Sequence, residues 1–142
     1  MSVTGPGADL YRARLQGSDL RGENLRKANL ALATLKESSL IDAVLADALL
    51  FCANLSGADL TGANLAGADL SEADLFAANL RGVNATQADF RRANLALANL
   101  RGARLTGANL RDANLKGADM TDALLEDADL TGAVFGEVEP DA

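Results

Sequence analysis

One five-residue unit occurs three times in succession in the stretch ANLSGADLTGANLAG, residues 53–67. Each unit has the form Ala-(Asp/Asn)-Leu-x-x, and we number its positions one to five from the alanine. The same register continues without insertion or deletion from residue 8 to residue 137, which makes 26 units. Leu holds position three in 22 units, Ala holds position one in 22, and Asp or Asn holds position two in 18. A register this strict predicts a repetitive structure.

The five-residue period fits neither a single helix nor a straight strand. In a helix, five residues turn the chain by about 500°, so the leucines would be spread over every face. In a straight strand, an odd period would send successive leucines to opposite faces. A short strand followed by a corner satisfies the pattern, because positions one and three then point inward and position two points outward. Gly occupies position five in ten units, as a corner favours, so we predict a chain wound into stacked coils.

The units 53–57, 58–62 and 63–67 resemble those of pentapeptide-repeat proteins, and the resemblance covers 130 of the 142 residues. It implies an all-β fold, a right-handed, four-sided parallel β-helix (solenoid) with four units per coil. The 26 units would form about 6.5 coils and a rod of roughly 31 Å at a strand spacing of ~4.8 Å. We expect an N-terminal tail over residues 1–7, the β-helix over 8–137 and an acidic C-terminal tail over 138–142.

The composition excludes several classes of site. The chain has no His and one Cys, so it lacks a Ser-His-Asp triad, a His metal ligand and a disulfide framework. Its net charge of −7 argues against direct nucleic-acid binding, and no run of 18 apolar residues predicts a transmembrane helix. Residues 1–7 show neither the charged nor the apolar region of a signal peptide. We expect a cytoplasmic protein that is not an enzyme, binds no cofactor or metal, and does not associate with membranes.

A few residues break the repeat at positions that should face the core. Ala85 replaces a Leu, while the neighbouring Val83 and Phe90 are larger than the residues usual at their positions. We interpret this as an exchange of volume, which cores tolerate well. Phe135 also replaces a core Leu. Glu23 stands at an inward position in the first coil, where we expect it to cap the end of the rod and reach water.

Apolar side chains also occur at positions that should face solvent. If residues 20 apart lie one above the other, then Tyr11, Leu32, Leu49, Phe51 and Cys52 form one cluster over the first three coils. We call these five residues the apolar patch. Single exposed apolar residues are ordinary, but contiguous ones mark interaction surfaces. The patch is therefore our candidate protein interface, and a homodimer through it is the simplest version.

Charge alternates in four bands along the sequence. The net charge is +3 over residues 1–36, −7 over 37–80, +5 over 81–116 and −8 over 117–142. Within the third band, we single out a candidate basic belt formed by Arg81, Arg91, Arg92, Arg101 and Arg111. Such charges commonly serve solubility, and the functional alternative is complementarity to the charges of a partner. The positive first band could also attract the negative last band of a second copy.

Three classes of function follow from these features. The first is a non-catalytic protein-binding or scaffold module whose partner the sequence does not identify. The second is a DNA mimic that binds DNA gyrase or another type II topoisomerase, as some pentapeptide-repeat proteins do in quinolone resistance. Three features argue against a DNA mimic: the basic belt, the Leu-rich core and the short segment after Phe135, where those proteins carry a dimerisation helix. The third is an enzyme, for which the sequence contains no convergent set of catalytic groups.

Overall fold

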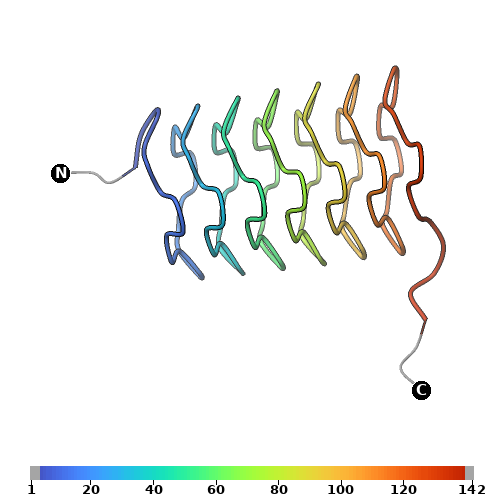
Figure 1. Ribbon diagram of the computed structural model, residues 1–142, viewed down its shortest axis with the longest axis horizontal. Coiled ribbons are helices and arrows are strands. Elements are labelled where there is room, and N and C mark those ends of the chain that lie inside the picture. The colour runs from blue at the N-terminus through green and yellow to red at the C-terminus, as the bar shows by residue number, and fades with distance from the viewer. Residues whose placement is uncertain (1–3, 140–142) are drawn as a thin grey trace.

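Parallel backbone pairing between residues 20 apart organises the chain. In the computed structural model, which describes residues 4–139, β-bridges connect Asp9 with Asn29, Asn29 with Leu49, and further pairs at this spacing as far as Val134. Each coil therefore contains four units, as the family resemblance implied. The coils stack along the long axis of the molecule, with the N-terminal residues at one end and the C-terminal residues at the other (Figure 1).

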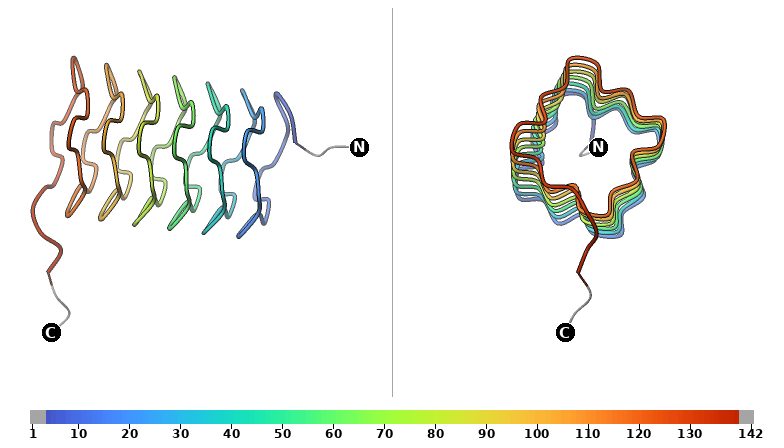
Figure 2. Two further views of the ribbon diagram at one scale, coloured as in Figure 1. Left: turned by 180° about the vertical axis from the view of Figure 1, so that it is seen from behind. Right: turned by 90° about the vertical axis from the view of Figure 1, so that its right-hand side faces the viewer.

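The sides of each coil are shorter than ordinary strands. Each side contributes one bridging residue, at position two of its unit, so the ladders consist of isolated bridges, and residues 4–139 contain no helix and no extended strand. Our sequence-based expectation of short strands is corrected in this respect. The corner occupies positions four and five of every unit up to residue 132, which leaves three residues for the side. Seen end-on, the coils superpose in a four-cornered outline (Figure 2).

Backbone hydrogen bonds join each coil to both of its neighbours, as the unit 53–57 shows. The N–H groups of Leu55 and Gly57 donate to carbonyls of the following coil, at 2.6 and 2.9 Å. The N–H of Asn54 donates to the preceding coil at 2.9 Å, and that of Ala53 closes the turn onto the carbonyl of Leu50 at 3.0 Å. Because pairing runs along the rod in both directions, each coil is held by its neighbours as in other solenoids.

The corners share one backbone conformation, whatever residue they contain. Position five has a positive φ in all the units from Gly7 to Gly132, and 15 of these residues are not glycine, with φ between 56° and 61°. A side chain in this left-handed region costs about 1–2 kcal/mol per residue. The sequence indicated corners from the glycines, and the structure shows that tertiary pairing imposes the same turn on Arg, Asp, Glu and Leu.

The interior is filled by the side chains of positions one and three. The third-position leucines from Leu25 to Leu110 are fully buried, and so are most of the first-position alanines between them. Val83, Ala85 and Phe90 are also fully buried, which is the arrangement that an exchange of volume requires. Ser38 replaces one of the alanines, and its hydroxyl donates to the carbonyl of Leu35 at 2.6 Å, so its buried oxygen is paired.

The solenoid begins slightly earlier than the expected N-terminal boundary. Gly7 donates to the carbonyl of Arg26 at 2.7 Å, so part of the expected N-terminal tail already belongs to the solenoid. Glu23 is partly buried and accepts a hydrogen bond from Thr4 at 3.1 Å, which fits a role at the end of the rod. Residues 1–3 and 140–142 of the two expected tails lie outside the described residues.

Phe135 does not lie in the core, and this expectation was wrong. Its residue surface is 53% exposed, because no described residue covers that side of the last coil. The neighbouring core positions Met120, Leu125 and Leu130 are partly exposed for the same reason. The C-terminal end of the described solenoid therefore presents apolar side chains, whereas Leu10 and Leu20 in the first coil are buried.

Candidate protein-interaction surface

The described residues offer no catalytic or metal centre. Within residues 4–139, no three Asp, Glu or Cys side chains gather in a way that could hold a metal ion, and no helix is long and apolar enough to cross a membrane. A shallow surface depression of about 310 Å³ lies where Gly57 stacks between Glu37 and Ala77, beside Lys36 and Phe76. It is open to solvent and contains no nucleophile with a base, so the outer surface is the functional candidate.

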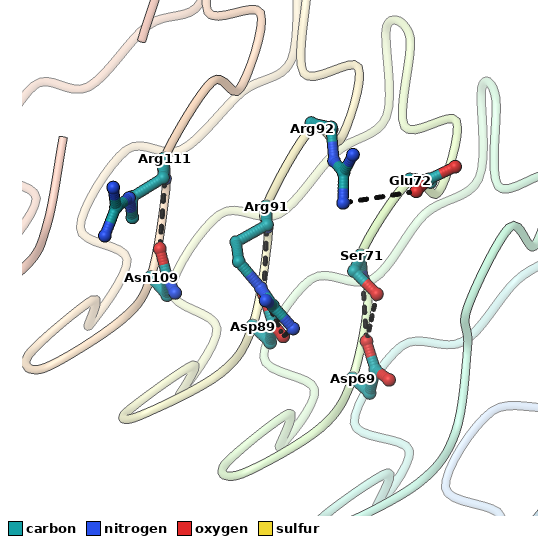
Figure 3. Close-up of polar contacts among 8 residues, drawn as sticks. All are labelled: Asp69, Ser71, Glu72, Asp89, Arg91, Arg92, Asn109 and Arg111. Atoms are coloured by element: carbon teal, nitrogen blue, oxygen red, sulfur yellow. Dashed lines mark hydrogen bonds and ion pairs between the residues drawn. The ribbon is translucent and has the colours of Figure 1, made fainter. Parts of the chain in front are cut away.

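The repeated Asp and Asn residues have a structural role that the sequence analysis missed. All 18 of them accept a hydrogen bond through Oδ1 from the backbone N–H two residues later, at 2.9–3.2 Å. This is the N–H of position four, the one that the turn and the neighbouring coils leave without a partner. Figure 3 shows the contact for Asp69, Asp89 and Asn109. The signal in the sequence was the recurrence of Asp and Asn at position two, because these side chains form such turns.

The structure brings the five residues of the apolar patch to one corner of the rod. Residues 11–12, 31–32, 51–52 and 71–72 stack there, since each position-five N–H donates to the next coil at 2.9–3.0 Å. Tyr11, Leu32, Leu49 and Phe51 expose 49%, 39%, 47% and 41% of their surfaces, and Cys52 is partly buried. Leu49 lies on the side that leads into this corner. We call this edge of the rod the patch corner.

Cys52 contributes to the patch as an apolar group. Its Sγ lies 3.9 Å from an Oε of Glu72 in the following coil. Burial, the Glu72 charge and this contact all raise the pKa of the Cys52 thiol. The side chain therefore stays protonated and is a weak nucleophile.

The basic belt is divided between two corners, and four of its five residues form ion pairs. Arg91, Arg92 and Arg111 lie on the patch corner, and Arg81 and Arg101 on the opposite corner. The pairs are Arg91 with Asp89 at 2.7 Å, Arg92 with Glu72 at 3.6 Å, Arg101 with Asp119 at 3.4 Å and Arg111 with Asp129 at 3.8 Å. Figure 3 shows the first two. Exposed pairs of this kind contribute about 0–1 kcal/mol each, and they reduce the free positive charge of the belt.

Several carboxyl groups have pKa values that are lowered by the ion pairs and hydrogen bonds that they form. The bidentate pair with Arg21 lowers the pKa of Asp19 to about 2. Burial acts to raise the pKa of Asp89, but the hydrogen bonds from Arg91 outweigh it and the net shift is downward. The hydroxyl and then the backbone N–H of Thr131 lower the pKa of Asp129. All three groups are ionised at neutral pH and serve as acceptors.

Further exposed apolar residues were not predicted as part of a surface. Leu97 lies on the corner next to the patch corner, one coil beyond Phe76, which is also exposed. Leu124 and Val134 are exposed as well. In the sequence, Leu124 and Val134 stand at position two, where most units have Asp or Asn. At Gly117 a Cβ would lie 2.7 Å from Leu97 and 3.2 Å from Val138, so the Val138 side chain lies against this corner.

Comparisons with known proteins agree with this architecture. A family model for pentapeptide repeats matches in 8 copies, which together span residues 8–138. The crystal structure of a pentapeptide repeat protein from the thylakoid lumen of Arabidopsis thaliana is 32% identical, covers 73% of this chain and 69% of its own, and has a TM-score of 0.58. QnrB1, a plasmid-mediated fluoroquinolone resistance protein, is 22% identical over 88% of this chain and 69% of its own, with a TM-score of 0.56, which shows likeness of fold alone. No curated protein is significantly similar in sequence.

Proposed function

The chain belongs to the pentapeptide-repeat family, and on this premise we propose that it is a non-catalytic, rigid β-solenoid that binds a partner protein through its outer surface. The observation that supports the proposal most strongly is the location of the apolar side chains. Those at positions one and three fill the lumen, and those of the apolar patch lie together on one corner, exposed to solvent. Contiguous exposed apolar surface of this kind is typical of interaction sites.

Rigidity supports the same function. Each unit between residues 28 and 117 satisfies four backbone N–H groups within the turn and the stack, and Asp or Asn satisfies the N–H of position four in 18 units of the chain. A surface whose shape is set by this pairing needs little reordering when it binds, which lowers the entropic cost of association. The patch is therefore a preformed surface.

The proposal is tested by photo-crosslinking in cells. A photoreactive phenylalanine analogue replaces Phe51 at the centre of the patch, and a matched variant carries it at Thr106, the same position of a unit on a different corner. We expect a discrete covalent adduct from position 51 and none from position 106. Equal labelling at the two positions, or no adduct at either, would contradict binding through the patch.

A DNA mimic that binds DNA gyrase is the second candidate. The net charge of −7 and the acidic bands over residues 37–80 and 117–142 favour it. The arginines between those bands oppose it, because they interrupt a continuous acidic surface. A gyrase supercoiling assay with and without a quinolone separates the two functions. We expect neither inhibition nor protection at micromolar protein, and a dose-dependent effect would establish the second candidate instead.

A further inference from the structure

We propose that the partner seated on the patch corner is a second copy of this chain, in an antiparallel, two-fold symmetric dimer whose axis passes between the second and third coils. This inference deepens the proposed function and rests on it. We number the coils from residue 8, so that coils 1 to 5 contain residues 8–27, 28–47, 48–67, 68–87 and 88–107. The proposal depends on which side chains such an axis brings opposite each other.

The patch corner carries two columns of side chains, one from position four and one from position five of the units. From coil 1 to coil 4, the first column reads Tyr11, Ala31, Phe51, Ser71, and the second reads Arg12, Leu32, Cys52, Glu72. The coils are one strand spacing apart, about 4.8 Å. A two-fold axis in the interface plane, perpendicular to the rod, keeps each column opposite itself and reverses the coil order.

An axis between coils 2 and 3 places large side chains opposite small ones. Phe51 then faces Ala31 of the second copy, and Leu32 faces Cys52. One coil further out, Tyr11 faces Ser71, whose own surface is largely buried. Tyr11, Leu32 and Phe51 therefore each meet a short side chain, and Leu49 faces Asn29 of the second copy. This match lets the two corners approach closely and exclude water from the patch.

The same axis pairs opposite charges at both rims. Arg12 faces Glu72 of the second copy, in the same column, where Glu72 also pairs with Arg92 of its own chain at 3.6 Å. Arg12 forms no ion pair within residues 4–139 and lies with its guanidinium 5.4 Å from the centre of the Tyr11 ring. On the adjoining side, Arg14 faces Asp74 of the second copy. The symmetry repeats each pair, since an isologous interface contains every contact twice.

Other arrangements lack this match. An axis through coil 3 places Arg12 opposite Arg92 of the second copy, and these like charges repel each other. A parallel arrangement places each charge band opposite a band of the same sign. The selected register contains one like-charged contact, between Asp9 and Asp69 of the second copy, and the Asp69 carboxylate is already engaged by the hydroxyl of Ser71 at 2.6 Å. Charge complementarity therefore selects both the direction and the register.

The test is a charge-exchange experiment read by sedimentation equilibrium on the full chain. The wild type is expected to form a dimer. Arg12→Glu and Glu72→Arg are each expected to raise the dimer Kd by roughly tenfold or more, because each variant places like charges opposite each other twice. In an equal mixture of the two variants, a heterodimer regains both Arg–Glu pairs, so mixing should restore dimerisation.

Two further variants complete the design. Phe51→Glu, at the centre of the patch, is expected to raise the Kd by about 30-fold or more, as loss of a central aromatic contact does. Arg81→Glu makes the same charge change as Arg12→Glu on the opposite corner and should leave the Kd unchanged. A dimer equally weakened by Arg81→Glu, or one that mixing does not restore, would refute the register.

The outcome also separates this inference from the proposed function. A wild type that stays monomeric at every concentration refutes the dimer. If residue 51 then still crosslinks to another protein in cells, the binding function stands with a different occupant. If it crosslinks to nothing, both fail.

Discussion

Asp and Asn at position two of the unit show how a single side chain supports this fold. Between residues 28 and 117, four N–H groups of each unit are paired by the turn and by the neighbouring coils, and the fifth points back toward the side chain two residues earlier. A short side chain with an oxygen at Cγ reaches that N–H, as in Asx turns generally. The 18 observed contacts explain why these residues recur without forming an acidic catalytic site.

The contact predicts the effect of changing one such residue. Asn64 accepts the N–H of Ala66 at 3.0 Å. Asn64→Ala should lower the free energy of unfolding by about 1 kcal/mol, since it leaves that N–H without its acceptor. Asn64→Asp keeps the oxygen and should cost much less. Urea denaturation of the three proteins measures the difference, and equal losses in the two variants would show that the contact contributes nothing.

The corner residues allow a paired test of backbone strain. Gly82 has a φ of +67° and a Cβ there would meet no atom within 4 Å, so Gly82→Ala isolates the conformational cost. We expect a loss of about 1 kcal/mol in the free energy of unfolding. Ala77, with a φ of 56°, offers the reverse change, and Ala77→Gly should be neutral or stabilising. Thermal unfolding measures both, and destabilisation by Ala77→Gly would contradict strain at the corner.

At the scale of the coil, the structural element of this fold is a closed layer of four units and not a strand. Each layer holds four residues from position three and four from position one, so a change of volume in one unit has to be matched in another. Ala85 and Phe90 occupy position three in adjacent units of two successive coils and are both fully buried. They are the clearest instance of such matching in the described core.

A double-mutant cycle tests whether these two positions compensate each other. Ala85→Leu alone should destabilise by about 1–3 kcal/mol through overpacking. Phe90→Leu alone should cost roughly 1 kcal/mol, because it removes buried volume. The double variant restores the consensus at both positions and should lose less than the sum, with a coupling of about 0.5–3 kcal/mol. Additive losses in urea denaturation would show that the two sites are independent.

At the scale of the whole molecule, stability should depend on acidic pH. The pKa of Asp19 is lowered to about 2, and those of Asp89, Asp119 and Asp129 are lowered as well. A carboxyl group with a lowered folded-state pKa stabilises the fold above its unfolded-state pKa of ~4, and this contribution is lost as the pH falls through the folded-state value. The melting temperature should therefore fall as the pH is lowered from 5 toward 2.

A single variant measures how much of this pH dependence comes from Asp129. Asp129→Asn keeps an oxygen for the N–H and the hydroxyl of Thr131, which lie at 3.0 and 2.6 Å, and it cannot titrate. Its melting temperature should fall less than that of the wild type over the same pH range. A steeper fall in the variant would contradict the lowered pKa of Asp129.

Much of the fold could be predicted from the sequence, and the surface less so. The period of five identified the core leucines and alanines, the outward second position and the corners, because each of these is local to one unit. Position alone also indicated that Tyr11 and Phe51 face outward. The ion pairs Arg92–Glu72 and Arg101–Asp119 could not be predicted, since they join residues 20 and 18 apart whose side chains had to be placed in space. Phe135 was misplaced because its sequence position resembles every other core position.

The repeat by itself determined that the chain winds into coils with Leu and Ala inside, since no other regular backbone returns the same face inward every five residues. It did not determine how many units close a coil, and the family resemblance supplied the number four. The bridges between residues 20 apart decide it in the structure. Closure at four units then brings Leu32, Leu49 and Phe51 onto one corner and leaves Phe135 exposed at the end of the stack. These outcomes depend on contacts between coils, which a five-residue pattern does not encode.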